Sequence, residues 1–599
     1  MSPATIVGEL TADQDHVILM AVGPDWEVAD AARTLMALTP LGKQTTPPGA
    51  LRIPATWPAV VQLSTAFGPF WQPGPALVAW ITEQVRRRTA TPSALTLATT
   101  PPPGMVPRRY QVEAACMIRE VGSCLLFDEP GVGKSMETVL GLVERAHAGH
   151  AVFPVLVVAP SSVVDPWLYE FRAWAPTWRV RAWRGSPERR RALAGTADVY
   201  VTSYGTVRRD AVDTNPRNSP LIGLRPVTVV ADECHLLKHQ ASSQSRAVRR
   251  LATRATTFIG LSGTPITHSP ACLWPTLEAL EPGAWPSRER WVGRYCTSIP
   301  GDYSSTVTGL NPYAEAEFRM TLLGRHRRVS KADVLAELPP KVYSVRTVDL
   351  PPAYRAAYDS LEQDMLAELP DGGELSVMSV LAQLTRLGQL ASAAADIETT
   401  TEIVTDPDTG LPMEKVHQKV TLKAPSWKVS ALLEVLDERP GQPVVAFAPS
   451  RQLIMLAGEA ATEAGLKVGH IVGGQTAKER TANREAFQRG DLDLICVTTG
   501  AGGVGLTLTA ARTVVFLQRP WSLVEAMQAE DRSHRLGSER HESIEIVDIV
   551  ARKTIDSRVR AVLRERAGQL ADLVQDPRIV AELLGGAEVR DLRKRKAAA

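Results

Sequence analysis

The sequence predicts an α/β protein with two tandem parallel-sheet lobes, preceded by a small α+β accessory domain. From Tyr110 onward, apolar segments of strand length alternate with longer helical segments, as in βαβ units around a buried parallel sheet. A second series of the same kind begins at Val444. The chain has 599 residues, too many for one core at about 150 residues per domain. These observations together indicate at least two lobes.

Residues 1–88 are predicted to form the separate accessory domain, in which strand-like segments such as Val17–Val22 alternate with helical ones. Residues 89–104 are rich in Pro, Thr and Ala, a composition typical of an extended, semi-rigid linker. Because Trp is first a large buried hydrophobe, we expect four tryptophans of this domain to lie in its core: Trp26, Trp57, Trp71 and Trp80.

The first lobe is predicted over residues 105–335 and the second over residues 429–565. Apolar runs predict the strands of the first lobe at Cys124–Phe127, Val155–Ala159, Val199–Thr202, Val227–Ala231 and Phe258–Leu261. Those of the second lobe are predicted at Val444–Ala448, Val468–Val472, Leu492–Val497, Val514–Leu517 and Ile544–Ile549.

Residues 336–428 are expected to form a helical connector between the lobes. Within it, Thr405–Gly410 is flanked by alternating Thr-, Val- and Ile-rich runs, a pattern that predicts an inserted β-hairpin. A helical tail is expected over residues 566–599.

A glycine-containing loop follows the first predicted strand and ends in Gly133, Lys134 and Ser135. Backbone N–H groups of such a loop and of the helix after it form an anion site, to which Gly131 and Gly133 would contribute. Lys134 is expected to reach the β- and γ-phosphates of a nucleotide, and the Ser135 hydroxyl to ligate Mg²⁺.

Two adjacent carboxylates end the strand predicted at Val227–Ala231. Asp232 is suited to hold the water shell of a metal ion, and Glu233 to orient and deprotonate an attacking water. An Asp-Glu pair alone is often only a helix cap. In this order after the phosphate-binding loop, the pair predicts hydrolysis of a nucleoside triphosphate.

The loop Asp128–Ser135 resembles that of the Swi/Snf-type ATPases of helicase superfamily two, which also begins with Asp-Glu. Further segments resemble the motifs of that family in the same order: Arg108–Gln111 the adenine-reading glutamine motif, Val157–Ser162 with Trp167, Glu170 and Phe171 motif Ia, Val201–Tyr204 motif Ib, Leu261–Pro265 motif III, Thr498–Ala510 motif V and Gln528–Gly537 motif VI. The sequence departs from the family pattern at Glu137, Thr267, His268 and Gln518.

The resemblance implies two RecA-like lobes of the P-loop NTPase type, with ATP and Mg²⁺ as cofactors and ATP held between the lobes. Gln111 is then expected to hydrogen-bond the adenine edge, the alternative being an ordinary helix-cap or surface amide. Gly505 is expected to line the nucleotide site. Lys134, Asp232 and Glu233 would carry the chemistry of the first lobe, with Ser135 and Asp232 as the residues for Mg²⁺.

Motif VI supplies Arg532 and Arg535, whose spacing predicts that both project from one helical face. The resemblance assigns both arginines to the phosphates, with Arg535 as the arginine finger that neutralises charge developing in the transition state. The alternative is a pair of solvated arginines on an exposed helix.

DNA phosphates are expected to meet hydroxyl groups and backbone amides at strand ends of both lobes. The residues implied are Ser161, Ser162, Thr202 and Ser203 in the first lobe, and Thr498 and Thr499 in the second. Each could instead be a structural turn or cap. The residues expected to couple the ATP state to the DNA face are His235, Ser262, Thr264 and Gln528.

The function expected from this resemblance is a DNA-dependent ATPase that translocates on or remodels duplex or forked DNA. Two alternatives are a non-motor DNA-binding adaptor, and a motor subunit of a nuclease or methyltransferase complex in restriction or repair. An adaptor is expected to have lost Lys134, Glu233 or an arginine finger, and the sequence retains all of them. Replication, repair or restriction proteins are possible partners.

The formal net charge is only +2, so DNA binding is expected to depend on local basic stripes. None of the six cysteines forms a Cys-x-x-Cys pair, which gives no support for a zinc ribbon or a disulfide framework. No apolar run approaches the ~20 residues of a membrane span, and the N-terminus lacks a signal-peptide pattern. We therefore expect no membrane partner and a cytoplasmic location, with a bacterial or phage-type origin.

Overall fold

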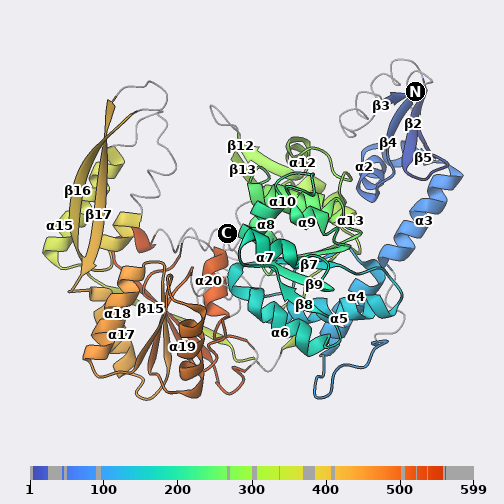
Figure 1. The fold of residues 1–599 in the computed structure, drawn as a ribbon. Coiled ribbons are helices and arrows are strands. Elements are labelled where there is room, and N and C mark those ends of the chain that lie inside the picture. Colours follow the sequence, from blue (N-terminus) through green and yellow to red (C-terminus); the bar gives the residue numbers. More distant parts are fainter. Residues whose placement is uncertain are drawn as a thin grey trace, which may run out of the picture. The chain divides into compact units, whose positions relative to one another are not determined.

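The computed structural model divides the chain into two compact units, Met1–Leu335 and Ala336–Ala599. It describes residues 5–23, 43–45, 50–89, 96–265, 270–299, 306–335, 338–367, 385–405, 412–500, 506–520, 523–535, 537–557 and 560. Each unit contains one large parallel sheet with helices packed on it (Figure 1). The predicted α/β fold of two RecA-like parallel-sheet lobes with a small N-terminal α+β domain is therefore confirmed.

The N-terminal domain has a five-stranded sheet in the order β3-β4-β2-β1-β5, and two helices among its described residues pack against this sheet. Its core gathers Ile6, Val17, Leu19, Ile53 and Leu77, all at most 1% exposed. Its elements are β1 (Thr5–Leu10), β2 (His16–Val22), β3 (Lys43–Thr45), β4 (Ala50–Pro54), α2 (Trp57–Phe67), β5 (Trp71–Pro73) and α3 (Pro75–Thr89).

Three of the four tryptophans expected in the core of this domain pack there. Trp57 is 6% exposed, and Trp71 and Trp80 pack against the core while half-buried. Trp26 lies outside the described residues.

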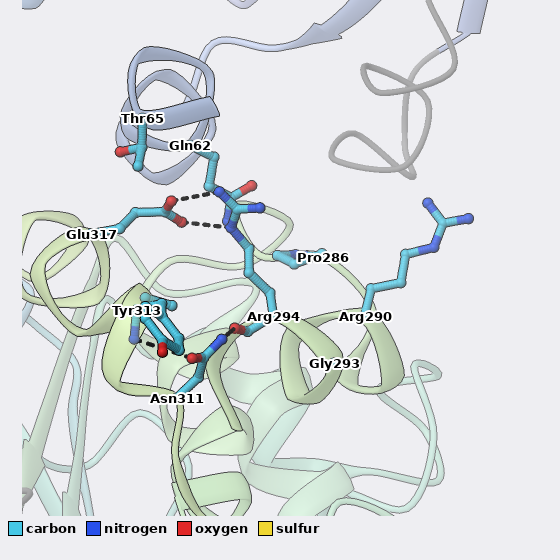
Figure 2. Close-up of a pocket in the computed structure, with 10 residues that line it drawn as sticks. Gln62, Thr65, Pro286, Arg290, Gly293, Arg294, Asn311, Tyr313 and Glu317 are labelled. Carbon is cyan, nitrogen blue, oxygen red and sulfur yellow. Dashed lines mark hydrogen bonds and ion pairs between the residues drawn. The ribbon is translucent and has the colours of Figure 1, made fainter. Parts of the chain in front are cut away.

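The N-terminal domain packs on the first lobe within the same unit. The Trp57 indole donates a hydrogen bond of 2.9 Å to the Met320 carbonyl, and the Gln62 amide donates one of 3.0 Å to the Tyr295 hydroxyl. Gln62 and Thr65 of α2 and the ion pair of Arg294 and Glu317, all labelled in Figure 2, line one pocket of about 520 Å³.

A second contact lies at the end of α3. The Arg88 guanidinium donates to Glu281 Oε1 at 2.9 Å and to the Leu323 carbonyl at 3.2 Å, and it lies 5.2 Å from the Trp57 ring centroid. Because the Arg88 side chain is only 5% exposed, the end of this helix is fixed to the first lobe.

The linker between domain and lobe is anchored over its described part. Glu144, whose side chain is fully buried, accepts hydrogen bonds of 2.8 Å from the backbone amides of Ala98 and Thr99 and one of 3.0 Å from Arg119. Residues 98 and 99 are therefore held against the lobe, and the extended, semi-rigid linker expected over residues 89–104 stays a prediction. The composition of the linker could not reveal this contact, because the carboxylate that accepts its backbone hydrogen bonds belongs to Glu144, outside the linker.

The first lobe has a seven-stranded sheet in the order β14-β6-β11-β10-β7-β9-β8, with all pairs parallel. All five predicted strands are confirmed. The strands are β6 (Cys124–Leu126), β7 (Val155–Ala159), β8 (Val180–Ala182), β9 (Val199–Ser203), β10 (Thr228–Asp232), β11 (Thr257–Leu261) and β14 (His326–Arg327). The sequence analysis missed β8 and β14, both short edge strands.

Helices cover both faces of this sheet in Figure 1. The helices described in the first lobe are α4 (Arg109–Val121), α5 (Lys134–His147), α6 (Val164–Trp174), α7 (Pro187–Ala192), α8 (Tyr204–Asp210), α9 (Pro220–Gly223), α10 (Ser243–Ala252), α11 (Trp274–Leu280), α12 (Arg288–Tyr295), α13 (Glu315–Thr321) and α14 (Lys331–Val334). A separate antiparallel pair is formed by β12 (Cys296–Ile299) and β13 (Thr306–Leu310).

The second unit has a six-stranded parallel sheet in the order β15-β22-β21-β18-β20-β19. Its strands are β15 (Lys341–Val348), β18 (Val444–Ala448), β19 (Val468–Ile471), β20 (Leu494–Thr498), β21 (Thr513–Phe516) and β22 (Ile544–Ala551). The predicted strands are all present. The segment assigned to the connector at 341–348 is instead the edge strand β15, whose residues are only half-buried or exposed and so carry no apolar run.

The helices of the second unit are α15 (Pro352–Ala367), α17 (Trp427–Asp437), α18 (Arg451–Glu463), α19 (Ala477–Arg489) and α20 (Leu523–Glu530). The expected hairpin is present as β16 (Ala394–Thr405) paired antiparallel with β17 (Pro412–Lys423). The tail expected at 566–599 lies outside the described residues. No helix in the described part of the chain is both long and apolar enough to cross a membrane.

Candidate active site

The glycine loop links β6 to α5 through two residues with left-handed backbone. Gly131 has φ of 91° and Gly133 has φ of 108°, conformations that favour glycine. Gly133 is the N-cap of α5, so the loop ends at the N-terminus of a 14-residue helix. The unpaired N–H groups of the first helical turn make this a site for an anion.

Lys134 and Ser135 are the first two residues of α5, and both are half-buried. The Lys134 ammonium folds back over the loop, where it donates to the carbonyl oxygens of Asp128 at 2.6 Å and of Glu129 at 3.0 Å. A cation is thus held above the helix N-terminus, the arrangement that a phosphate chain requires.

Gln111 is buried against this loop and does not project into open space. Its amide nitrogen donates to the Val132 carbonyl at 3.0 Å, and its Oε1 accepts from the Arg108 backbone amide at 2.8 Å. A Cβ on Gly133 would lie 2.7 Å from Gln111 Nε2, so the close approach requires glycine. In this structure Gln111 caps α4 and braces the loop, and its expected hydrogen bond to the adenine edge stays a prediction.

Asp232 and Glu233 lie at the carboxyl end of β10, at the same edge of the sheet as the glycine loop. In parallel α/β sheets, ligands bind at this edge. The Trp167 indole donates 2.8 Å to Asp232 Oδ2, and the Tyr204 hydroxyl donates 2.7 Å to the Asp232 backbone carbonyl. Burial, together with the neighbouring Glu233 carboxylate, raises the pKa of Asp232 to about 6.

Residues Ser135 and Asp232 offer a hydroxyl and a carboxylate, the oxygen donors that Mg²⁺ prefers beside phosphate oxygens and water. Trp167 orients the Asp232 carboxylate by its bond to Oδ2, at the same sheet edge as Ser135. The donor set fits Mg²⁺.

Glu233 is a non-glycine residue with left-handed backbone, at φ of 52°. Strain of this kind is concentrated at functional sites. Glu233 Oε2 lies 3.1 Å from His235 Nδ1, which lies 3.0 Å from Ser262 Oγ. The Thr264 backbone amide donates 3.1 Å to the same serine oxygen. Three of the four expected coupling residues therefore form one chain with Glu233.

The candidate DNA residues of the first lobe divide into two groups. Ser161 and Ser162 are exposed just after β7. Thr202 is 1% exposed and its hydroxyl donates to the Trp183 carbonyl at 3.0 Å, so burial removes that hydroxyl from the expected phosphate contact. Ser203 is the N-cap of α8, where its hydroxyl accepts from the Thr206 amide.

In the second unit, Thr498 ends β20 and Thr499 follows it, at 7% and 8% exposure. Gln528 is half-buried on α20. Gly505 lies outside the described residues.

The motif VI arginines do not lie on a regular helical face, contrary to the prediction. Helix α20 ends at Glu530. Arg532 follows in a turn, where the amides of residues 532 and 533 bond carbonyls three residues back, and Arg535 lies in a bend. Both guanidinium groups still converge on one acceptor, the Leu506 carbonyl, at 3.5 and 3.4 Å.

Sequence reasoning missed a buried carboxyl pair beneath the glycine loop. Asp128 and Glu137 are both 0% exposed, and Arg327 Nε lies 3.7 Å from Asp128 Oδ2. Burial raises the pKa of Asp128, and burial with the neighbouring Asp128 raises that of Glu137 well above its usual range. The departure from the family pattern at Glu137 was the signal for this pair.

Comparison with known proteins identifies the family of this chain. A model of the SNF2-related domain matches residues 76–394, and a model of the helicase conserved C-terminal domain matches residues 427–537. The mouse protein named DNA annealing helicase and endonuclease ZRANB3 is 26% identical over 472 residues, covering 75% of this chain and 39% of that protein.

The putative ATP-dependent helicase/translocase YwqA of Bacillus subtilis is 26% identical over 487 residues, covering 80% of this chain and 49% of that protein. The chain thus spans less than half of the length of these two relatives. Among solved structures, the Sulfolobus solfataricus SWI2/SNF2 ATPase core in complex with dsDNA has 21% identity and a TM-score of 0.37, covering 83% of this chain and 98% of that one.

Proposed function

The chain belongs to the SNF2-related family, and from this we propose that it is a DNA-dependent ATPase that translocates on or remodels duplex or forked DNA. The observation that carries the proposal is the shared sheet edge, where the glycine loop before α5 meets Asp232 and Glu233 at the end of β10. That edge combines an anion site with two carboxylates, which are the groups needed to hold and hydrolyse a nucleoside triphosphate.

In this proposal, the amides of the α5 N-terminus and the Lys134 ammonium bind the phosphates of ATP. Ser135 and Asp232 hold Mg²⁺, which would neutralise phosphate charge when bound. Glu233 orients the attacking water and takes its proton. Its strained backbone and its contact with His235 fix the carboxylate before the substrate arrives.

Arg532 and Arg535 are proposed to act on the γ-phosphate. Their convergence on the Leu506 carbonyl, directly after the glycine-rich segment of motif V, supports a shared role. Hydrolysis is therefore proposed to depend on both arginines, and turnover to include a conformational step.

DNA is proposed to contact Ser161 and Ser162 through its phosphates, with Ser203, Thr498 and Thr499 contributing backbone or hydroxyl donors. Two relatives, named a DNA annealing helicase and a helicase/translocase, support DNA as the effector. Contacts of this kind carry no sequence information and weaken as salt rises.

The test is the steady-state ATPase rate without nucleic acid and with single-stranded, duplex and forked DNA, at low and high salt. Duplex or forked DNA should stimulate the wild type, and the stimulation should fall as salt increases. The Glu233→Gln variant controls for a contaminating ATPase. A wild-type rate that is indifferent to every DNA at low salt would overturn the proposal.

A further inference from the structure

Two aromatic side chains hold the acidic pair from segments that lie outside the glycine loop. Trp167 is 1% exposed on α6, and its indole nitrogen lies 2.8 Å from Asp232 Oδ2. Tyr204 is 5% exposed at the start of α8, and its hydroxyl lies 2.7 Å from the Asp232 carbonyl oxygen. One bond orients the carboxylate and the other orients the backbone.

The backbone bond has a specific consequence for Glu233. The Asp232 carbonyl belongs to the peptide that joins Asp232 to Glu233, and Glu233 has the left-handed φ of 52°. A conformation of this kind persists only when surrounding contacts over-determine it. The Tyr204 hydroxyl is such a contact, because it fixes the plane of the preceding peptide.

Both aromatic residues follow hydroxyl residues proposed to meet DNA. Helix α6 comes directly after the short turn that contains Ser161 and Ser162, and Tyr204 comes directly after Ser203. Because both aromatic side chains are buried in the close-packed lobe, we expect a shift at either serine segment to reach a ring that is bonded to Asp232.

We propose that Trp167 and Tyr204 are positioning residues, which transmit DNA binding at these two segments to Asp232 and Glu233. This route is separate from the chain through His235 and Ser262, because it reaches the acidic pair from β7 and β9 and not from β11. The inference rests on the proposed function for its DNA effector.

The bonds of Trp167 and Tyr204 reach different groups of Asp232, so their loss should have different effects. Loss of the indole N–H frees the Asp232 carboxylate, which is the proposed Mg²⁺ residue, so metal dependence should change. Loss of the tyrosine hydroxyl frees the peptide before Glu233, so turnover should fall with little change in metal dependence.

The experiment uses Trp167→Phe and Tyr204→Phe in the full chain, since both changes keep the ring. The matched controls make similar bonds elsewhere in the lobe. Trp183, which is 0% exposed, donates 2.7 Å to Asp210, and the Tyr200 hydroxyl donates 2.9 Å to the Leu193 carbonyl. Trp183→Phe and Tyr200→Phe therefore report the cost of losing a buried hydrogen bond without touching the acidic pair.

Two readouts are measured for all four variants: Mg²⁺-dependent binding of a fluorescent ATP analogue, and ATPase rate with and without duplex DNA. In Trp167→Phe, the Mg²⁺ concentration for half-maximal binding should rise about 10-fold or more, as expected for loss of one hydrogen bond to a charged group. In Tyr204→Phe, the stimulation by duplex should fall while that Mg²⁺ concentration stays near the wild-type value.

The inference is overturned if Trp167→Phe binds the analogue with the same Mg²⁺ dependence as Trp183→Phe. It is also overturned if Tyr204→Phe keeps the DNA stimulation of Tyr200→Phe. The binding readout needs no hydrolysis, so a wild type that binds the analogue without turnover would count against the proposed function while still testing the Trp167 bond.

Discussion

The imidazole Nδ1 of His235 lies between two oxygen atoms, 3.0 Å from Ser262 Oγ and 3.1 Å from Glu233 Oε2. His235 follows β10 and Ser262 follows β11, the neighbouring strand of the parallel sheet. One buried side chain therefore connects the acidic pair to the segment after the next strand.

We predict that Ser262→Ala reduces the coupling between DNA and hydrolysis. The variant removes the oxygen that bonds both His235 and the Thr264 amide, so the chain to Glu233 is cut at one end. Stimulation of the ATPase by duplex DNA should fall about fivefold or more, because fivefold is the lower end of the effects that coupling between two sites usually has. Ser245→Ala, another fully buried serine of the same lobe, is the control. Equal stimulation in both variants would contradict the role of Ser262.

Lys134→Ala should weaken nucleotide binding. The ammonium is the cation held over the start of α5, and a hydrogen bond to a charged group contributes about 1.5–3 kcal/mol. Equilibrium binding of a fluorescent ATP analogue should show a loss of about 10- to 100-fold. Unchanged affinity would mean that the loop does not bind phosphate.

Glu233→Gln should keep nucleotide binding and lose turnover, because it removes the base and leaves the phosphate site intact. The expected loss in kcat is at least about 10²-fold. Rate and affinity are measured on the same preparation with saturating duplex DNA. Turnover equal to the wild type would remove Glu233 from the mechanism.

Arg535→Ala should abolish hydrolysis while ATP binding survives. An arginine finger contributes on the order of 10³–10⁵ in rate and acts mainly on the transition state. Arg532→Ala should be similarly damaging or slightly milder, since both guanidinium groups converge on the Leu506 carbonyl. An Arg535→Ala rate within a few-fold of the wild type would show that the second unit does not complete the active site.

Glu144→Gln should lower thermal stability in a pH-dependent way. Burial opposes ionisation of Glu144, but hydrogen bonds from Thr99, from the Ala98 and Thr99 amides and from Arg119 outweigh it and lower the pKa. A depressed pKa contributes stability above the unfolded value of 4.5, and that contribution is lost as pH falls through the folded value. The difference in Tm between wild type and variant should therefore be larger at pH 7 than in acid. A difference that is constant with pH would contradict an ionised Glu144.

Much of the fold could be predicted because a strand buried on both faces must be apolar throughout. Every residue of β7 and β18 is buried, and each strand is a continuous apolar run with the predicted bounds. The edge strand β15 was missed for the same reason, since its alternating exposure leaves no such run.

In the candidate site, too, some features could be predicted from the sequence and others could not. Glycines, lysine and paired carboxylates at fixed spacing are local features, so the sequence alone indicated the phosphate loop and the acidic pair. The turn that holds Arg532 and the burial of the Thr202 hydroxyl depend on neighbouring segments, and no local pattern reports them.

By itself, the sequence determined the two sheets, the order of the motifs and the residue types available for chemistry, because those follow from short-range periodicity and spacing. Only the tertiary structure decided that Trp167 bonds Asp232, that Glu144 anchors the linker and that Gln111 braces the glycine loop. Each of these contacts joins residues that are distant in sequence or buried by other elements. Their partners are set by packing, which must satisfy every buried polar group that the fold encloses.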